Sequence, residues 1–390
     1  MRRKTICTSI VFVIAAALLP AMALVETEGN TYDFDVSPGG TIYFDLKSGA
    51  GVSIRGWDKS KAEVTYAQRG KGHKHDVEIL QQRDGLMITS DIQMHEGTST
   101  DLDFEIRLPH KYNVHFESMG GGLKVAELTG KITGSTMGGG LTLWEVDGTV
   151  SLTTMGGSIE VIDADLDGKM STMGGTVYLK NVVGDLDATS MGGNVKYENV
   201  RGRDGNLRAP EGSSEWLGMK TVNISTMGGD IEVDEAPAGA WVKTMGGDIE
   251  VEDASGFVRA TTMGGNVYVE IADGWVDAST MAGDVDVTIA GGLGDSEKGV
   301  NLSSCCGDIS LALPAGLPLD LDLTISYTKN SEQDYEFISD FDLDVERSKD
   351  WDYSNGSPRK RIHGTATIGS GKYPVVIKTI NGNIRLKTID

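Results

Sequence analysis

The chain has 390 residues, 52 of them glycine, and its 57 acidic against 35 basic side chains give a formal net charge of -22 at pH 7. A surface this acidic repels nucleic acid and anionic lipid, so we expect neither as a partner. It is compatible with divalent cations, although acidic surfaces more often serve solubility.

The first segment, residues 1–23, has the pattern of an export signal. Arg2 to Lys4 form a basic start, an apolar run follows from Ile10 to Leu19, and Ala21-Met22-Ala23 is a small-x-small cleavage site. No later stretch supplies the ~20 apolar residues of a membrane-spanning helix. We expect a mature chain from about Leu24 that is periplasmic, at the cell surface or extracellular; losing three positive charges lowers its net charge to -25.

Residues 24–118 alternate apolar and polar side chains without the register of the repeat that follows. Segments such as "TIYFDL" (41–46) and "DLDFEIRL" (101–108) have the two-residue period of half-buried strands. A bare end of a repeat array is an edge prone to aggregation. We therefore expect this β-rich segment to act as an N-terminal cap.

Residues 119–313 repeat a Met-Gly-Gly unit, as in "STMGGDI" (225–231). Counted from the methionine as position 0, each coil has apolar pairs at positions 4 and 6 and at 13 and 15, each preceded by a glycine, which predicts two short strands and two turns. Constant spacing stacks equivalent strands in parallel, so we predict an all-β parallel β-solenoid of about eleven 18-residue coils with β-rich caps. The methionines recur every 18 residues in two series: Met119, Met137, Met155, Met173 and Met191, then, after a gap of 36, Met227, Met245, Met263 and Met281.

Two irregularities interrupt the period. The 36-residue gap implies one degenerate coil centred on Ala209, which carries an excursion at Arg201–Gly218. After Met281 the unit reappears 24 residues later as "SSCCGDISL", with Cys305 in the methionine position, which indicates a six-residue insertion.

Cys305 and Cys306 are the only cysteines that remain after the export signal. In an oxidising compartment they either form a vicinal disulfide, which we favour, or stay as a buried thiol and a thiol in the turn.

The Met-Gly-Gly unit has three interpretations. A phosphate-binding glycine loop would need a following helix, whereas a strand pattern follows each copy. A row of methionines would suit copper, which is a soft metal. We favour the third, in which the thioethers point into the lumen and contact each other from coil to coil, at ~1.5 to 3 kcal/mol for each buried side chain.

The residues beside the methionine predict how the turns are built. Position 2 is glycine in every regular coil, whereas position 1 admits Ala282 and Cys306, so only position 2 needs a positive φ or a missing Cβ. Position 17 is Ser or Thr in every regular coil. Many equivalent hydroxyls predict a ladder of hydrogen-bonded turns rather than a nucleophile.

Acidic residues gather at positions 3 and 5 of neighbouring coils, where like charges would lie about 5 Å apart. Asp230, Asp248 and Asp284 at position 3 are therefore candidates for weak Ca²⁺ binding. We do not expect folding to require calcium, because the "GGxGxDxUx" pattern of the calcium β-roll is absent. His73 and His75 would supply only two ligands of a metal site.

Residues 314–390 form the last segment. The pattern loosens after Pro314, residues 327–360 are highly polar, and "KTINGNIRL" (378–386) repeats the coil motif with Ile380 in the methionine position. We expect a C-terminal β cap that closes as a further coil.

Three stretches together resemble a known family: "SGAGVSIRGWDKSKAEVTY" (48–66), the serial "T-M-G-G-x-I-x-V" coils, and "GSGKYPVVIKTINGNIRL" (369–386). The chain is similar to bacterial adhesin-like proteins, exported β-solenoids otherwise described as a domain of unknown function. The resemblance covers nearly all of the mature chain and implies a repetitive β fold at the envelope or outside the cell, with an adhesive or scaffolding role. It supplies no catalytic motif.

Two classes of function stay open. The first, which we favour, is a non-enzymatic exported protein whose faces bind a protein, a carbohydrate or another copy of itself. The second is a β-helical polysaccharide lyase or hydrolase, which needs clustered carboxylates beside aromatic platforms. The aromatic candidates for such a platform are Trp216, Trp241 and Trp275.

Overall fold

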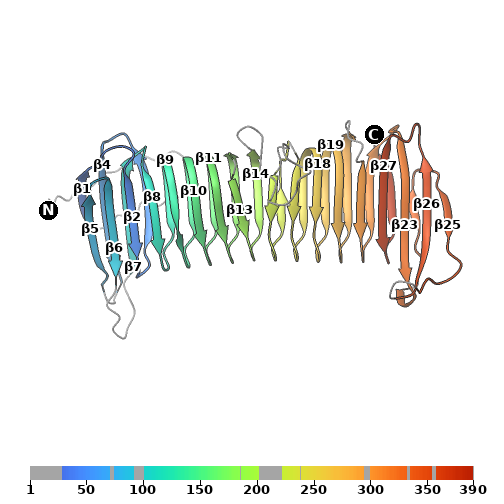
Figure 1. Ribbon diagram of the computed structural model, residues 1–390, viewed down its shortest axis with the longest axis horizontal. Helices are drawn as coiled ribbons and strands as arrows, with labels where there is room; N and C mark the ends of the chain where they lie inside the picture. The colour runs from blue at the N-terminus through green and yellow to red at the C-terminus, as the bar shows by residue number, and fades with distance from the viewer. Residues whose placement is uncertain are drawn as a thin grey trace. The chain divides into compact units, whose positions relative to one another are not determined.

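The structure is a computed structural model in which the fold is all-β, with strands that lie side by side (Figure 1). The chain divides into two compact units, Met1–Asp165 and Leu166–Asp390, and β11 (Ile159–Thr172) crosses the boundary. The predicted export signal and most of the excursion lie outside the described residues. Those are residues 29–70, 74–91, 101–184, 186–201, 222–237, 239–293, 299–331, 334–353 and 357–389.

The first unit combines a parallel ladder with antiparallel outer strands. Strand β2 pairs in parallel with β6 and β8, and β3 pairs in parallel with β7 and β9. The pairs β1–β4, β4–β7 and β5–β6 are antiparallel. The strands are β1 (Asn30–Asp35), β2 (Thr41–Leu46), β3 (Gly51–Trp57), β4 (Lys61–Arg69), β5 (Asp76–Gln82), β6 (Gly85–Asp91), β7 (Asp101–Pro109), β8 (Asn113–Ser118), β9 (Leu123–Thr136) and β10 (Leu141–Thr154).

The second unit continues with parallel pairs. Its strands before the last segment are β12 (Val177–Val183), β13 (Leu186–Ser190), β14 (Val195–Arg201), β15 (Val222–Ser225), β16 (Ile231–Val233), β17 (Ala240–Lys243), β18 (Ile249–Thr261), β19 (Val267–Thr280), β20 (Val285–Gly292), β21 (Val300–Ser304) and β22 (Ile309–Pro314). The remaining elements are β23 (Leu319–Thr328), the 3-10 helix η1 (Lys329–Ser331), β24 (Phe337–Ser339), β25 (Asp344–Arg347), β26 (Arg359–Thr367), β27 (Tyr373–Ile380) and β28 (Ile384–Ile389).

The register of the parallel pairs confirms the 18-residue lap. Leu141 lies opposite Leu123 in the first unit, and Val267 lies opposite Ile249 in the second. In the coil of Met245 the inward positions 4, 6, 9, 13, 15 and 17 are at most 1% exposed: Ile249, Val251, Ala254, Val258, Ala260 and Thr262. Small and β-branched side chains thus fill the lumen between the two strands of each coil.

The predicted burial of the methionines is wrong. The nine repeat methionines are the exposed members of the turn, from 45% exposed at Met263 to 57% at Met119, whereas the neighbouring hydroxyl at position 17 is buried. Side chains alternate along the strand that ends the coil, so the inward direction of positions 13 and 15 continues to position 17 and leaves position 0 outside.

The predicted degenerate coil centred on Ala209 is also wrong. Met227 N donates to Met191 O at 3.1 Å, and Val195 lies opposite Ile231, so the coils of these two methionines pair directly. The described residues leave no place for a coil between them. The 18 extra residues are therefore an insertion within one coil, and the number of coils predicted from the spacing is one too many at this point.

The 24-residue step after Met281 is an insertion in one coil. Val276 lies opposite Val300, whereas Val285 again lies opposite Ile309, and Cys305 N donates to Thr280 O at 3.3 Å. Cys305 thus takes the methionine position, as predicted.

The last segment closes the second unit out of chain order. Strands β27 and β28 pair in parallel with β21 and β22, and β23 and β24 pair with the far side of β27 and β28. Strand β26 pairs antiparallel with β23 and β25. Ile380 takes the methionine position of this closing coil, because Thr379 Oγ1 donates to Gly307 O at 2.7 Å, as position 17 does elsewhere.

Candidate functional site

The corner of each Met-Gly-Gly coil is held by the hydroxyl at position 17. Thr244 Oγ1 donates to Gly229 O of the preceding coil at 2.9 Å and accepts from Gly247 N of its own turn at 3.3 Å. The same pair of bonds recurs at Thr136, Ser190, Thr226 and Thr262. The hydroxyls form the predicted ladder of hydrogen-bonded turns and are fully engaged in it.

The sulfur side chains of the second unit form a row on the outside of this corner, which we call the sulfur ridge. The backbone hydrogen bonds of the turns step from one coil to the next, so equivalent side chains lie in one column. The ridge consists of Met173, Met191, Met227, Met245, Met263, Met281 and Cys305.

The acidic residues at position 3 serve the backbone. Asp230 Oδ1 accepts from Asp248 N at 2.9 Å, and Asp248 Oδ1 accepts from Asn266 N at 2.6 Å. Asp284 Oδ1 accepts from Asp308 N at 2.8 Å in the same way. The calcium candidates Asp230, Asp248 and Asp284 therefore each have one carboxylate oxygen committed to the next coil. Within the described ranges, no group of three or more His, Cys, Asp or Glu side chains is placed to hold a metal ion.

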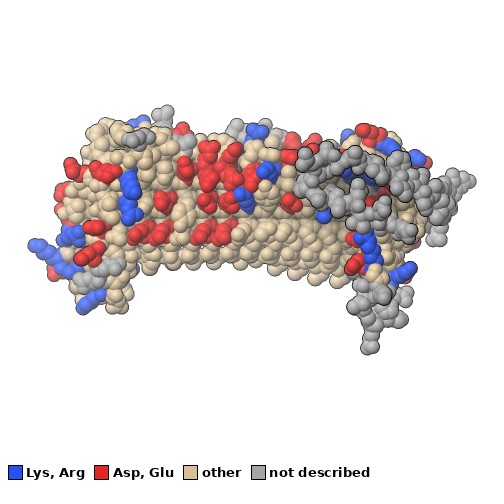
Figure 2. All heavy atoms as spheres, turned by 180° about the vertical axis from the view of Figure 1, so that it is seen from behind, with Lys and Arg blue, Asp and Glu red and all other residues tan. Residues whose placement is uncertain are grey.

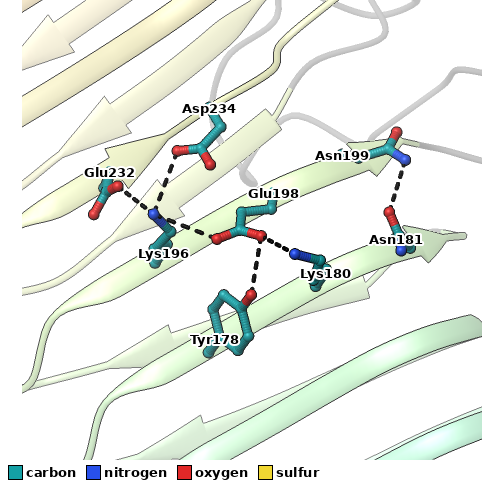
Figure 3. A network of polar contacts seen from close by, with 8 residues as sticks. All are labelled: Tyr178, Lys180, Asn181, Lys196, Glu198, Asn199, Glu232 and Asp234. Carbon is teal, nitrogen blue, oxygen red and sulfur yellow. Dashed lines mark hydrogen bonds and ion pairs between the residues drawn. The ribbon is translucent and has the colours of Figure 1, made fainter. Parts of the chain in front are cut away.

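A charged network covers the outer face of β12, β14 and β16 (Figure 3). Lys196 Nζ forms ion pairs with Glu232, with Glu198 at 3.4 Å and with Asp234 at 3.6 Å. Glu198 Oε2 also accepts from Lys180 Nζ at 2.7 Å. Three carboxylates thus share two ammonium groups in stacked coils.

Two polar side chains extend this network. The Tyr178 hydroxyl donates to Glu198 Oε2 at 2.9 Å, and Asn199 Nδ2 donates to Asn181 Oδ1 at 2.9 Å (Figure 3). Asn181 and Asn199 occupy position 8 with φ of 51° and 50°, a left-handed conformation that Asn tolerates better than most residues.

The network fixes the charge of its members. The hydrogen bond from Lys180 lowers the pKa of Glu198, and the hydrogen bond to Glu232 raises the pKa of Lys196. Burial raises the pKa of the Asp234 carboxyl, which Lys196 partly offsets. Glu198 and Lys196 are thereby held in their charged forms at neutral pH, the opposite of the shift that prepares a general acid or base.

The compensation ends one coil further along the same face. Glu232 lies opposite Glu250, and Glu250 lies opposite Tyr268, which in turn lies opposite Asp286. Glu250 and Asp286 are exposed, and Tyr268 is 43% exposed between them. Figure 2 shows acidic side chains gathered on this side of the molecule, over the strands around β18.

Sequence reasoning located the acidic columns but missed this network and the exposed tyrosine. Positions 5 and 7 alternate in charge between neighbouring coils, with Lys196 beside Glu232 and Lys180 beside Glu198. That alternation at an 18-residue spacing is the signal that would have found the network. The left-handed residues at position 8 were signalled only where asparagine stands there.

The other predicted candidates lie apart from this face. Trp275 is 6% exposed and stacks on Phe257 with ring centroids 5.0 Å apart, and Trp241 carries Arg259 at 5.2 Å from its ring. Trp216 lies outside the described residues. Cys305 and Cys306 are free thiols, and both are exposed.

The histidine pair is not assembled as a site in the described residues. His75 is 5% exposed, and its Nδ1 lies 2.6 Å from Ser48 Oγ. His73 lies outside the described residues. The search for membrane spans, made over the described residues, finds no helix long and apolar enough to cross a bilayer.

Comparison with known proteins gives a family and little else. The family described as Toastrack DUF4097 matches residues 41–387. No curated protein matches significantly. Among solved structures, a "putative cell adhesion protein" from Clostridium sporogenes ATCC 15579 is 9% identical, with 93% of this chain and 100% of that chain covered, at a TM-score of 0.16.

Proposed function

Because the chain belongs to the Toastrack DUF4097 family, we propose that it is an exported, non-enzymatic adhesin or envelope scaffold that binds a partner along its outward-facing columns. Export rests on the basic start and apolar run of residues 1–23. The partner face is the column of Glu250, Tyr268 and Asp286, together with the neighbouring carboxylates.

The exposed ring between two carboxylates is the observation that carries this proposal. Tyr268 offers a rigid apolar surface with a polar tip, which is the kind of side chain that dominates recognition surfaces. Glu250 and Asp286 on either side are acceptors for hydroxyl or amino groups. Neutral or amino-bearing carbohydrate chains present both features, so we favour a glycan over a protein as the partner.

Repetition supports a binding role along an extended surface. Each coil offers the same backbone frame at a spacing of about 4.8 Å, so weak contacts in neighbouring coils act together on one polymer. Lys180 and Lys196 neutralise the face at one side, which leaves the acidic group around Glu250 as the distinct patch.

The experiment is a glycan-array and cell-binding assay on the full chain, with Tyr268→Ala as the variant. Its matched control is Tyr43→Ala, because Tyr43 is also 43% exposed but lies on β2 of the first unit. We expect Tyr268→Ala to weaken binding about tenfold, as for a central interface tyrosine, and Tyr43→Ala to leave it unchanged. Equal binding by the full chain and Tyr268→Ala would reject this face.

A depolymerisation assay on the same glycans separates the two classes of function. A binding protein leaves the chain length of the polymer unchanged. Release of shortened or unsaturated fragments would instead support the β-helical polysaccharide lyase or hydrolase and overturn the non-enzymatic proposal.

A further inference from the structure

The sulfur ridge has a chemical uniformity that packing does not explain. Its methionines are between 45% and 52% exposed, so they gain only part of the stabilisation of a buried side chain. Leucine has similar volume and would pack as well, and a polar side chain would cost less at the surface. Yet every Met-Gly-Gly coil carries sulfur at position 0, including the coil in which Cys305 replaces the methionine.

Other exposed columns of the same coils are not uniform. Position 5 holds Tyr178, Lys196, Glu232, Tyr268 and Ser310 in different coils of the second unit. The backbone geometry of the repeat therefore does not impose one residue type on an exposed column. The retained feature of the ridge is the sulfur atom.

We propose that the sulfur ridge binds a soft monovalent metal ion, Cu(I), with its tightest position at Met281, Cys305 and Cys306. Thioether and thiolate ligands select Cu(I) over hard cations. Metal–sulfur bonds of about 2.3 Å place two sulfurs on one ion up to about 4.6 Å apart. Coils stack at about 4.8 Å, and methionine has three flexible torsions, so neighbouring ridge side chains reach a common ion.

The thiol end of the ridge is fixed by the backbone. Cys305 N donates to Thr280 O at 3.3 Å, and Cys306 N donates to Ser304 Oγ at 3.3 Å. Cys305 therefore lies in the column of Met281, and Cys306 lies in the adjacent column, opposite Ala282. Both thiols are free and exposed, which leaves them accessible to an ion from solvent.

Binding at this end involves no change of oxidation state. Each thiol that ligates Cu(I) loses its proton to solvent, and the Met281 thioether supplies a neutral third ligand. Across the described ranges, no group of His, Cys, Asp or Glu side chains offers a competing site for a harder ion. This inference is independent of the glycan face, because the ridge lies at the corner of the coil.

The test is a titration of the reduced full chain with Ag(I), a redox-stable analogue of Cu(I), and with Cu(I) in competition with a chromogenic chelator. We expect more than one ion per chain. The ε-methyl NMR signals of the ridge methionines should shift on addition of Ag(I), whereas that of Met87, which lies in β6 away from the ridge, should not.

Variants then locate the tight position. Cys305→Ser/Cys306→Ser/Met281→Leu should weaken the first binding step at least tenfold, as expected for the loss of direct ligands. Tyr268→Leu, an equally exposed change one coil away from Met281, should leave it unchanged. Unshifted ridge methyl signals in the full chain, or unchanged affinity in the triple variant, would overturn the proposal. The methyl measurement needs no variant, so a folding defect cannot leave the question open.

Discussion

At the residue scale, glycine at position 2 is required by a close approach of backbone and not by its dihedral angles. A Cβ on Gly247 would lie 2.2 Å from Gly229 O, whereas a Cβ on the adjacent Gly246 would lie 3.5 Å from the nearest atom, Gly228 O. The alanine tolerated at position 282 occupies the roomier of the two positions. The sequence copies therefore revealed which glycine matters, and the structure identifies the missing Cβ as the reason.

This difference predicts a sharp contrast between neighbouring substitutions. We expect Gly247→Ala to destabilise the protein by about 3 kcal/mol or more, because backbone must move to admit the methyl group. Gly246→Ala should change stability by less than about 0.5 kcal/mol, as for an ordinary surface change. Urea unfolding followed by circular dichroism measures both, and similar midpoints would contradict the steric argument.

The buried hydroxyl at position 17 makes a second residue-scale prediction. Thr244→Val keeps the shape of the side chain but leaves Gly229 O and Gly247 N without their partner, so we expect a loss of about 1–3 kcal/mol. Thr244→Ser keeps both hydrogen bonds and reproduces the residue found at Ser190 and Ser304, so its cost should stay below about 1 kcal/mol. Valine and serine variants of equal stability would show that the hydroxyl ladder contributes nothing.

The same corner shows what the sequence could and could not predict. The spacing of the methionines fixed the lap, since only a repeating backbone path keeps 18 residues per turn. Hydrophobicity then misassigned the corner, because Met245 is more apolar than the adjacent Thr244 and was placed inside. Strand alternation from Val242 already directed Thr244 inward, and the turn needs a buried hydroxyl more than the lumen needs a thioether.

At the element scale, the position-3 ladder explains the acidic residues that suggested calcium. Each side chain binds the backbone of the next coil, a task that Asn266 performs as well as Asp248. We expect Asp248→Asn to keep this bond, remove the repulsion with Asp230, and leave stability equal or up to about 0.5 kcal/mol higher. Asp248→Ala should lose about 1 kcal/mol.

Thermal melts with and without EDTA complete that experiment. Neither the full chain nor Asp248→Asn should change its Tm on chelation, because one oxygen of each position-3 aspartate already serves the backbone. A Tm that falls with EDTA in the full chain alone would show that calcium stabilises the ladder after all.

The charged network on β12, β14 and β16 predicts a pH dependence. The pKa of Glu198 is lowered in the folded state, chiefly by Lys180, so its contribution to stability is present above its ordinary pKa of 4.5 and is lost as pH falls through the lowered value. The raised pKa of Asp234 acts in the opposite direction. Stability of the full chain alone therefore reports a mixture of the two.

The difference between the full chain and Glu198→Gln isolates the Glu198 contribution. We expect the full chain to be more stable at pH 7 and low salt, with the difference shrinking below about pH 4.5 and in high salt. Urea midpoints at several pH values measure it. Asp187→Asn, which changes a carboxylate outside the network, is the control. A difference that is independent of pH would mean that Glu198 acts by packing alone.

At the scale of the whole chain, periodicity predicted the repeat but not the way in which the array is interrupted and closed. A gap of two periods looked like a degenerate coil at Ala209, yet an insertion of one period has the same spacing. Only the direct pairing of Val195 with Ile231 distinguishes them. The Ile380 motif located the closing coil, whereas its insertion between β22 and β24 needed long-range pairing that no local pattern records.

That insertion makes the last segment a cover for the parallel edge of the second unit. Without residues 315–390, the strands β21 and β22 would present unpaired backbone and the apolar ends of the lumen at Leu302, Ile309 and Leu311. Open parallel edges recruit further strands. We therefore expect the chain truncated after Pro314 to form concentration-dependent oligomers by size exclusion with light scattering, under conditions in which the full chain does not. Placing a lysine on the bared edge, by Asn301→Lys in the truncated chain, should reduce this association, because charge on an edge strand opposes pairing. A truncated chain that stays at the size of the full chain's monomer would show that the edge is protected by something other than β27 and β28.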